Sequence, residues 1–161
     1  MPNHRAVAIA NEFLSRRADE AWPQQMYIQK LVHIANGWNL AVNGYPLVDE
    51  LPQAWDNGPV FRSIWDHIKE YGFRGKHNTL VDPEKKTVIS EELTDNERRI
   101  IDHVWAKYGH LSGGQLSKLT HEPDTPWERA YFGRGRNSRL DPEDIRNHYI
   151  DLALAGRGSA A

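Results

Sequence analysis

His121, in the stretch Thr120-His121-Glu122, is the residue whose type and neighbours offer the widest chemistry in this sequence. An imidazole beside a hydroxyl and a carboxylate can act as a general base or as a metal ligand. A zinc site needs three or four ligands held together, and histidine pairs on one helix usually stand four residues apart. None of the 8 histidines stands four residues from another, so the sequence predicts no metal site.

Two other interpretations of His121 stay open. In the favoured one the side chain is structural, and it hydrogen-bonds a helix end or packs on Trp127. In the other it makes a polar contact with a partner molecule. A structural role predicts that replacing His121 with alanine lowers stability before it removes any activity.

Other catalytic signatures are missing from the sequence. There is no cysteine, which excludes disulfides, thiolate zinc sites and a cysteine nucleophile. There is no GxSxG elbow, no Walker-type phosphate loop and no dinucleotide fingerprint. Gly113 and Gly114 could place a phosphate at a helix N-terminus, but helix entry is the simpler use of two glycines. We therefore predict no catalytic residue, no cofactor and no enzymatic activity.

A basic stretch near the C-terminus offers a different chemistry. Arg134, Arg136 and Arg139 follow Tyr131 and Phe132, and arginines mixed with aromatic rings can bind single-stranded nucleic acid. Acidic residues flank the stretch on both sides, and the whole chain has a formal net charge of -2. A solvated loop is the favoured interpretation, and nucleic-acid binding through the Arg134–Arg139 loop stays an alternative function.

The stretch QAWDNGPVFRSIW indicates a surface for protein recognition. Its Gly-Pro pair makes a rigid corner between aromatic residues, and exposed aromatic side chains often supply much of the binding energy of a protein interface. The alternative is that the aromatic residues fill the core, which is our expectation for Trp65. The predicted partner-binding residues are Trp55, Asn57, Gly58, Pro59, Phe61 and Arg62.

The composition indicates one globular domain that positions these motifs. A chain of 161 residues has single-domain length and can bury a sizeable core. Hydrophobic residues make up 39% of the chain and charged residues 26%, which is too apolar for a disordered protein. No stretch resembles a signal peptide or a membrane span. We expect a domain over residues 1–155, a flexible tail over 156–161 and a cytoplasmic location.

Apolar periodicity and capping residues predict a mainly α-helical fold of about seven helices. The second helix is expected to be central, because its apolar residues cover more than one face. Residues 73–92 differ, since short β-branched runs on both sides of 82–86 predict a small β-hairpin. The first two expected helices cover about residues 3–18 and 24–42, and the third runs from the Asn57–Pro59 turn to Tyr71. Three further helices begin at capping boxes at Thr94, Ser112 and Thr125. The last helix begins at Asp141.

Four stretches taken together resemble a known family: YIQKLVHIANGWNLAVNGYPL, QAWDNGPVFRSIWDHIKEYG, VWAKYGHLSGGQLSKLTHEPDTPW and DPEDIRNHYI. In this order and spacing they are similar to the Panacea domain, the SocA-like antitoxin domain that also occurs in phage-associated GepA-like proteins. The resemblance covers about residues 5–150. The family often has a tyrosine before the Gly-Pro pair, where this chain has Asn57. The matching residues are Gln29, Lys30, Leu31, Trp38, Ala54, Trp55, Gly58, Pro59, Val60, Leu111, Ser112, Leu116, Thr120, His121, Pro126 and Trp127.

The resemblance implies an antitoxin that neutralises a toxin encoded by a neighbouring gene through direct protein–protein contact. It implies no catalytic activity and no cofactor. Some members are thought to deliver the toxin to a cytosolic AAA+ protease, which would be a second partner. Toxin specificity is expected from the Trp55–Phe61 corner and from residues 73–92. Within the matching set we expect structural roles for Gln29, Lys30, Trp38, Thr120, His121, Pro126 and Trp127.

Overall fold

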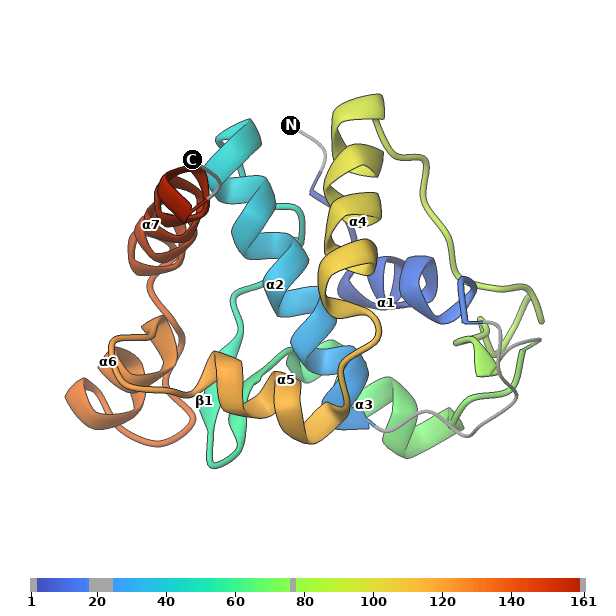
Figure 1. The fold of residues 1–161 in the computed structure, drawn as a ribbon. Helices are drawn as coiled ribbons and strands as arrows, with labels where there is room; N and C mark the ends of the chain where they lie inside the picture. Colours follow the sequence, from blue (N-terminus) through green and yellow to red (C-terminus); the bar gives the residue numbers. More distant parts are fainter. Residues whose placement is uncertain (1–2, 18–24, 76–77, 160–161) are drawn as a thin grey trace.

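Helix α2 (Gln25–Asn43) runs through the centre of the fold in this computed structural model (Figure 1). The structure describes residues 3–17, 25–75 and 78–159. Helices α1, α3, α4, α5 and α7 and strand β2 all pack against α2. Every residue from Ile28 to Leu40 is buried, so the central position expected for this helix is confirmed.

The described residues form seven helices, and the mainly α-helical prediction is confirmed. Thr94 and Ser112 each make a full capping box, in which side chains and backbone amides bond reciprocally. Thr125 caps its helix too, but the Glu128 carboxylate accepts from the Asp124 amide instead of from Thr125. Besides α2, the helices are α1 (Ala6–Leu14), α3 (Arg62–Tyr71), α4 (Asp95–Tyr108), α5 (Gly113–Thr120), α6 (Pro126–Gly133) and α7 (Pro142–Ser159).

The two-stranded sheet lies elsewhere than the sequence predicts. Strands β1 (Gln53–Trp55) and β2 (Gly58–Val60) pair antiparallel across a two-residue turn, where we expected irregular chain and the start of a helix. Helix α3 therefore begins only at Arg62. Pro59 is tolerated in β2 because the strand has a partner on one side only.

The hairpin predicted within residues 73–92 is reduced to a short antiparallel turn without regular strands in the described part of that range. Only one bridge forms there, between Val81 and Val88. Asn11 of α1 explains this, because its amide nitrogen donates to the carbonyls of Leu80 and Ile89, each at 2.8 Å. Its amide oxygen accepts from the Leu80 amide at 2.7 Å. A side chain thus takes backbone groups that a ladder would have used.

The ends of two helices also differ from expectation. Helix α1 stops at Leu14, short of the residue 18 expected from the sequence. Helix α7 continues to Ser159, well beyond Leu152, the last apolar residue from which the helix is expected. In the described part of the chain, no helix has both the length and the apolarity that crossing a membrane requires.

Buried polar side chains of α2 hold the neighbouring chain segments in place. The Asn36 amide oxygen accepts from the backbone amides of Leu47 and Val48 at 2.8 and 3.2 Å. One turn later, Asn39 donates to the carbonyl of Tyr45 at 2.8 Å. Side chains can do this because irregular chain leaves its backbone groups without ladder partners, and buried groups must be satisfied. The same device positions the hairpin, as described next.

Candidate functional site

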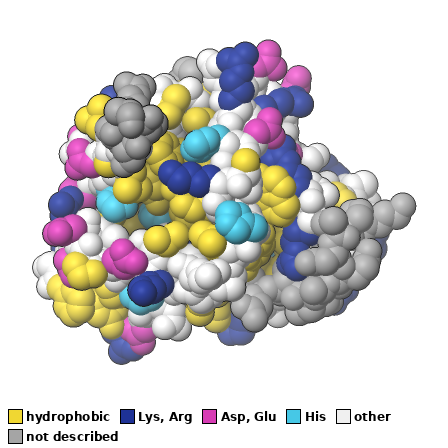
Figure 2. Space-filling model, viewed as in Figure 1, with side chains coloured by type: hydrophobic (Ala, Val, Ile, Leu, Met, Phe, Trp, Pro, Cys, Tyr) yellow, Lys and Arg dark blue, Asp and Glu magenta, His cyan; other side chains and the backbone are white. Residues whose placement is uncertain are grey.

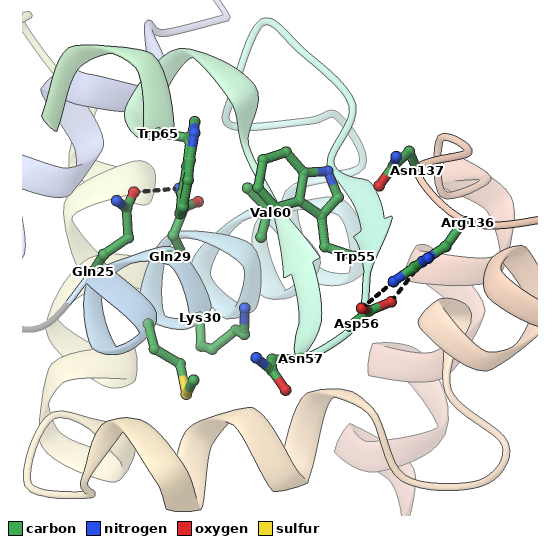
Figure 3. A pocket seen from close by; sticks show the side chains of 11 residues that line it. Gln25, Gln29, Lys30, Trp55, Asp56, Asn57, Val60, Trp65, Arg136 and Asn137 are labelled. Carbon is green, nitrogen blue, oxygen red and sulfur yellow. Dashed lines mark hydrogen bonds and ion pairs between the residues drawn. The ribbon is translucent and has the colours of Figure 1, made fainter. Parts of the chain in front are cut away.

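A cleft of about 520 Å³ opens between α2, the β1–β2 hairpin, α3 and the loop after α6 (Figure 3). It combines apolar and aromatic walls with amide and charged groups, as ligand pockets do. Its lining residues are Gln25, Met26, Gln29, Lys30, Trp55, Asp56, Asn57, Val60, Trp65, Arg136 and Asn137.

Lys30 and Gly58 fix the hairpin against α2. The Lys30 Nζ donates to the Pro59 carbonyl at 2.8 Å. Gly58 has a φ of +117°, and a Cβ atom there would lie 2.9 Å from Lys30 Cε. Glycine therefore meets two needs at this position, the backbone conformation and the close approach of the lysine.

The hairpin is also held from α5 and α6. The Ser117 hydroxyl donates to the Asn57 carbonyl at 2.5 Å. The Trp127 indole N–H donates to the Trp55 carbonyl at 2.6 Å. Gln29 binds the chain just after β2, accepting from the Phe61 amide at 2.8 Å and donating to its carbonyl at 3.2 Å. Three helices, α2, α5 and α6, thus hold the eight-residue hairpin Gln53–Val60 and the residue that follows it.

Two tryptophans form the aromatic wall of the cleft. Trp55 and Trp65 meet edge to face, with ring centroids 4.9 Å apart. Trp55 is oriented by its indole N–H, which donates to Gln53 at 2.9 Å. Both rings are half-buried. The expectation that Trp65 fills the core is therefore wrong: helix α3 buries Ile64 instead and presents Trp65 to the cleft.

An exposed ion pair forms the rim. The Arg136 guanidinium binds both carboxylate oxygens of Asp56, with Nε to Oδ1 at 2.9 Å. The Tyr131 hydroxyl donates to the same carboxylate at 2.7 Å. These hydrogen bonds, first that from Arg136, hold the pKa of Asp56 below its ordinary value. The Asp56 carboxylate is therefore fully charged at neutral pH, and both of its oxygens already accept hydrogen bonds within the protein.

Lys30 is the unusual charged group of the cleft. Its side chain is 1% exposed, and burial lowers its pKa to about 7. The ammonium form is disfavoured there because a buried charge loses its hydration. Near neutral pH the Lys30 amine is therefore present in both protonation states, and an anionic neighbour would stabilise its ammonium form.

His121 occupies a corner between α5 and α6. It follows the last residue of α5, and its Nδ1 bonds the Ser117 carbonyl. Its ring packs edge to face on Trp127 with centroids 5.4 Å apart. Trp127 in turn stacks on Tyr131 at 4.6 Å. These are the two contacts expected of a structural His121, at a helix end and on Trp127.

The other residues expected to be structural lie inside the fold. Trp38 is 5% exposed, its indole N–H donates to the Tyr108 hydroxyl at 3.3 Å, and its ring meets that of Tyr149. Thr120 is buried and donates to the Leu116 carbonyl at 3.0 Å. Pro126 is the first residue of α6, where a missing amide hydrogen costs nothing.

The residues predicted to bind a partner divide into two groups. Trp55 and Asn57 line the cleft, and Arg62 is exposed beside it in sequence and pairs with Asp66 at 3.1 Å. Gly58 and Pro59 are buried, and Phe61 is 0% exposed. Phe61 as a partner contact is therefore a wrong prediction, since its ring belongs to the core.

Sequence reasoning missed several residues of the cleft. Asp56, Trp65 and Arg136 line it, and Lys30 was assigned only a structural role. One signal was present: a lysine inside the buried stripe of α2 demands a reason. The contact between Asp56 and Arg136 joins residues 80 positions apart, so no local pattern could show it.

The arginine loop is occupied by interactions within the protein. Arg136 binds Asp56, and Arg134 donates to the Arg139 carbonyl at 2.8 Å. Arg129 pairs with Asp144 at 3.5 Å. These contacts compete with phosphate for the guanidinium groups and do not favour the nucleic-acid alternative.

A second hollow lies between α2, α4, α5 and α7, where hydrophobic and histidine side chains gather on the face shown in Figure 2. Ile34, Tyr108, Leu119, His148 and Tyr149 are among its lining residues. Within residues 3–17, 25–75 and 78–159, no three His, Asp or Glu side chains gather as metal ligands would.

Comparison with known proteins now assigns the class. The family described as antitoxin SocA-like, Panacea domain, matches residues 28–128, from α2 into α6. The chain belongs to this family, and the resemblance inferred from the sequence is confirmed. The antitoxin SocA of Caulobacter vibrioides (strain NA1000 / CB15N) is 27% identical over 140 residues, which are 84% of this chain and 74% of that protein. No solved structure matches the chain.

Proposed function

We propose that this protein is a cytosolic antitoxin that neutralises a toxin, encoded by a neighbouring gene, by binding it directly. Membership of the antitoxin family supports the role. The proposed binding site rests on one observation: the corner around Trp55 is held in place by hydrogen bonds and borders the cleft. Tryptophan and arginine in such settings are the usual anchors of protein interfaces.

The corner surface of this proposal consists of Trp55, Asn57 and Arg62. Trp55 is half-buried, while Asn57 and Arg62 are exposed. Because Lys30, Ser117 and Trp127 hold the hairpin backbone, the corner loses little conformational freedom when a partner binds. Preorganisation of this kind supports an inhibitor that acts by occupancy. Delivery of the bound toxin to an AAA+ protease is compatible with the same surface.

The test is co-expression with the adjacent open reading frame. The neighbouring gene is induced alone, with the wild-type chain, with Trp55→Ala and with Leu154→Ala. Leu154 is a matched control because it is 57% exposed and lies on α7, away from the cleft. We expect growth rescue by the wild type and Leu154→Ala and at least a tenfold loss of plating efficiency with Trp55→Ala.

Two outcomes separate the proposed function from the proposed site. A toxic neighbour that the wild type does not rescue contradicts the antitoxin function for that pair. Rescue by the wild type and Trp55→Ala alike keeps the function and removes the corner surface. Thermal melts of the purified variants distinguish a lost contact from a lost fold.

A further inference from the structure

We propose that the cleft beside the hairpin binds a carboxylate carried on an apolar or aromatic body, with the Lys30 ammonium as its counter-ion. The inference deepens the proposed function and rests on it for one source of the carboxylate, an acidic side chain of the toxin. The other source is a free organic acid, which would make the cleft a regulatory site.

The charge balance of the cleft is the first step. Its charged lining groups are Lys30, Asp56 and Arg136. Asp56 and Arg136 neutralise each other at the rim. Lys30 is bonded only to the neutral Pro59 carbonyl, which leaves two of its three N–H donors for another acceptor. In the described residues no carboxylate pairs with Lys30, so the protonated form of Lys30 gives the cleft one uncompensated positive charge.

The second step is that Lys30 is not the sole support of the hairpin. Ser117 and Trp127 hold the hairpin through two other hydrogen bonds, and Gln29 makes two more with Phe61, directly after it. Burying an ammonium group is costly, and an apolar side chain of similar length would fill the space without that cost. A buried lysine with a lowered pKa in a cleft is typical of a functional site. An arriving carboxylate would restore the ammonium form.

The third step is the shape of the complementary ligand. Met26, Trp55, Val60 and Trp65 give the cleft apolar walls, and Figure 3 shows Lys30 reaching from α2 toward the hairpin. Amide groups complete the lining. A volume of about 520 Å³ lies within the range of small-molecule pockets. A ligand with an apolar body of modest size and a terminal carboxylate would pack on the apolar walls and pair with the Lys30 ammonium.

The experiment titrates the full-length protein with 3-phenylpropionate at pH 6, where the ammonium form of Lys30 predominates, and follows heat and tryptophan fluorescence. 3-Phenylpropionamide has the same shape without the charge. Lys30→Met removes the ammonium group, and Lys118→Met is the matched control, since Lys118 is exposed on α5. We expect the amide and Lys30→Met each to weaken binding at least tenfold, and Lys118→Met to leave it unchanged.

Several results would overturn the inference. These are an acid that does not bind, an amide that binds as well as the acid, or unchanged binding by Lys30→Met. The comparison of acid and amide uses the wild type only, so it holds even if Lys30→Met fails to fold.

A second arm identifies the source of the carboxylate. Displacement of the purified toxin by 3-phenylpropionate, with loss of rescue by Lys30→Met, assigns the carboxylate to the toxin. Toxin binding that is unaffected by the acid assigns the cleft to a free organic acid. Failure of acid binding with intact rescue removes this inference alone, and acid binding without rescue removes the proposed function alone.

Discussion

At the scale of single residues, His121 shows how a chemically versatile side chain can serve a structural purpose. Its ring lies between the last turn of α5 and Trp127, and its Nδ1 bonds the Ser117 carbonyl, which also accepts from the His121 amide and the Thr120 hydroxyl. In the part of the chain that the structure describes, His121 belongs to no group of three His, Asp or Glu side chains that could hold a metal ion. We therefore propose a structural role for His121.

Replacing His121 with alanine should lower the free energy of unfolding by about 1 kcal/mol, the usual value of one net hydrogen bond or one aromatic pair. Urea unfolding followed by circular dichroism measures the change. Toxin neutralisation should persist at temperatures where the variant is folded. A variant of unchanged stability that no longer neutralises the toxin would show instead that His121 contacts the partner.

His4 and Glu97 form a buried charged pair with a defined pH response. The His4 Nε2 lies 3.0 Å from Glu97 Oε1, and Nδ1 lies 2.9 Å from Glu91 Oε1. Burial opposes the charged imidazole, but the bonds to Glu97 and Glu91 outweigh it and raise the pKa of His4. Burial likewise opposes the Glu97 carboxylate, and bonds from Thr94, Tyr45 and His4 outweigh it and lower its pKa.

A histidine with a raised pKa stabilises the fold fully below its unfolded pKa of about 6.5, and this contribution is lost as the pH rises through the folded value. His4→Gln should therefore be less stable than the wild type by about 2 kcal/mol at pH 5.5, the value of a hydrogen bond to a charged group. The difference should shrink as the pH rises above 6.5. The other histidines are the same in both proteins, so the difference isolates His4. Urea unfolding at several pH values measures it, and a difference independent of pH would contradict the charged pair.

At the scale of elements, the packing of α2 on α7 depends on a residue that has no side chain. A Cβ atom on Gly37 would lie 2.2 Å from the ring carbons of Tyr149. Tyr149 is 4% exposed, so its ring has nowhere to move unless α7 shifts. The close contact between α2 and α7 therefore requires glycine at position 37.

Gly37→Ala should destabilise the protein by about 2 kcal/mol or more, as overpacked cores do. Gly156→Ala is its control, because Gly156 lies in α7 and has no atom within 4 Å of an added Cβ. That control should be neutral or more stable by up to about 1 kcal/mol, the helix propensity difference. Thermal melts of the two variants test the contrast. Equal effects would mean that α7 does not pack on α2 as closely as described.

The elements that could be predicted from sequence are those whose signals are local. The capping residues Thr94 and Ser112 and the buried stripe of α2 are local, and they were predicted correctly. The hairpin was misplaced because Pro59 argues against a strand, while the β-branched residues near Val81 and Val88 favour one. Contacts from distant elements decided both cases, and no local pattern contains them.

The candidate site was predictable only in part for the same reason. Trp55 and Asn57 belong to one short motif, and both line the cleft. The roles of Lys30 and Arg136 follow from where α2 and the loop after α6 meet the hairpin. Phe61 was assigned to the surface because an aromatic residue beside a turn looks the same in sequence whether its ring points in or out.

At the scale of the whole molecule, one buried helix organises both the fold and the cleft. The polar residues Gln29, Lys30, Asn36 and Asn39 of α2 each bind backbone of the segment from Tyr45 to Phe61. The corner surface is therefore mounted on the core of the protein. A surface held this firmly suits recognition by a preformed shape, in which little ordering is needed when the partner binds.

Neutralisation by occupancy predicts a definite stoichiometry. In a cell-free assay of the toxin, its activity should fall in proportion to the added protein and reach zero at a fixed molar ratio. This follows because each antitoxin molecule protects only the toxin that it covers, when binding is tight compared with the concentrations used. Trp55→Ala should need a large excess to reach the same inhibition, whereas Leu154→Ala should follow the wild-type line. Full protection at a small fraction of the toxin concentration would contradict occupancy and indicate that the protein acts repeatedly on its partner.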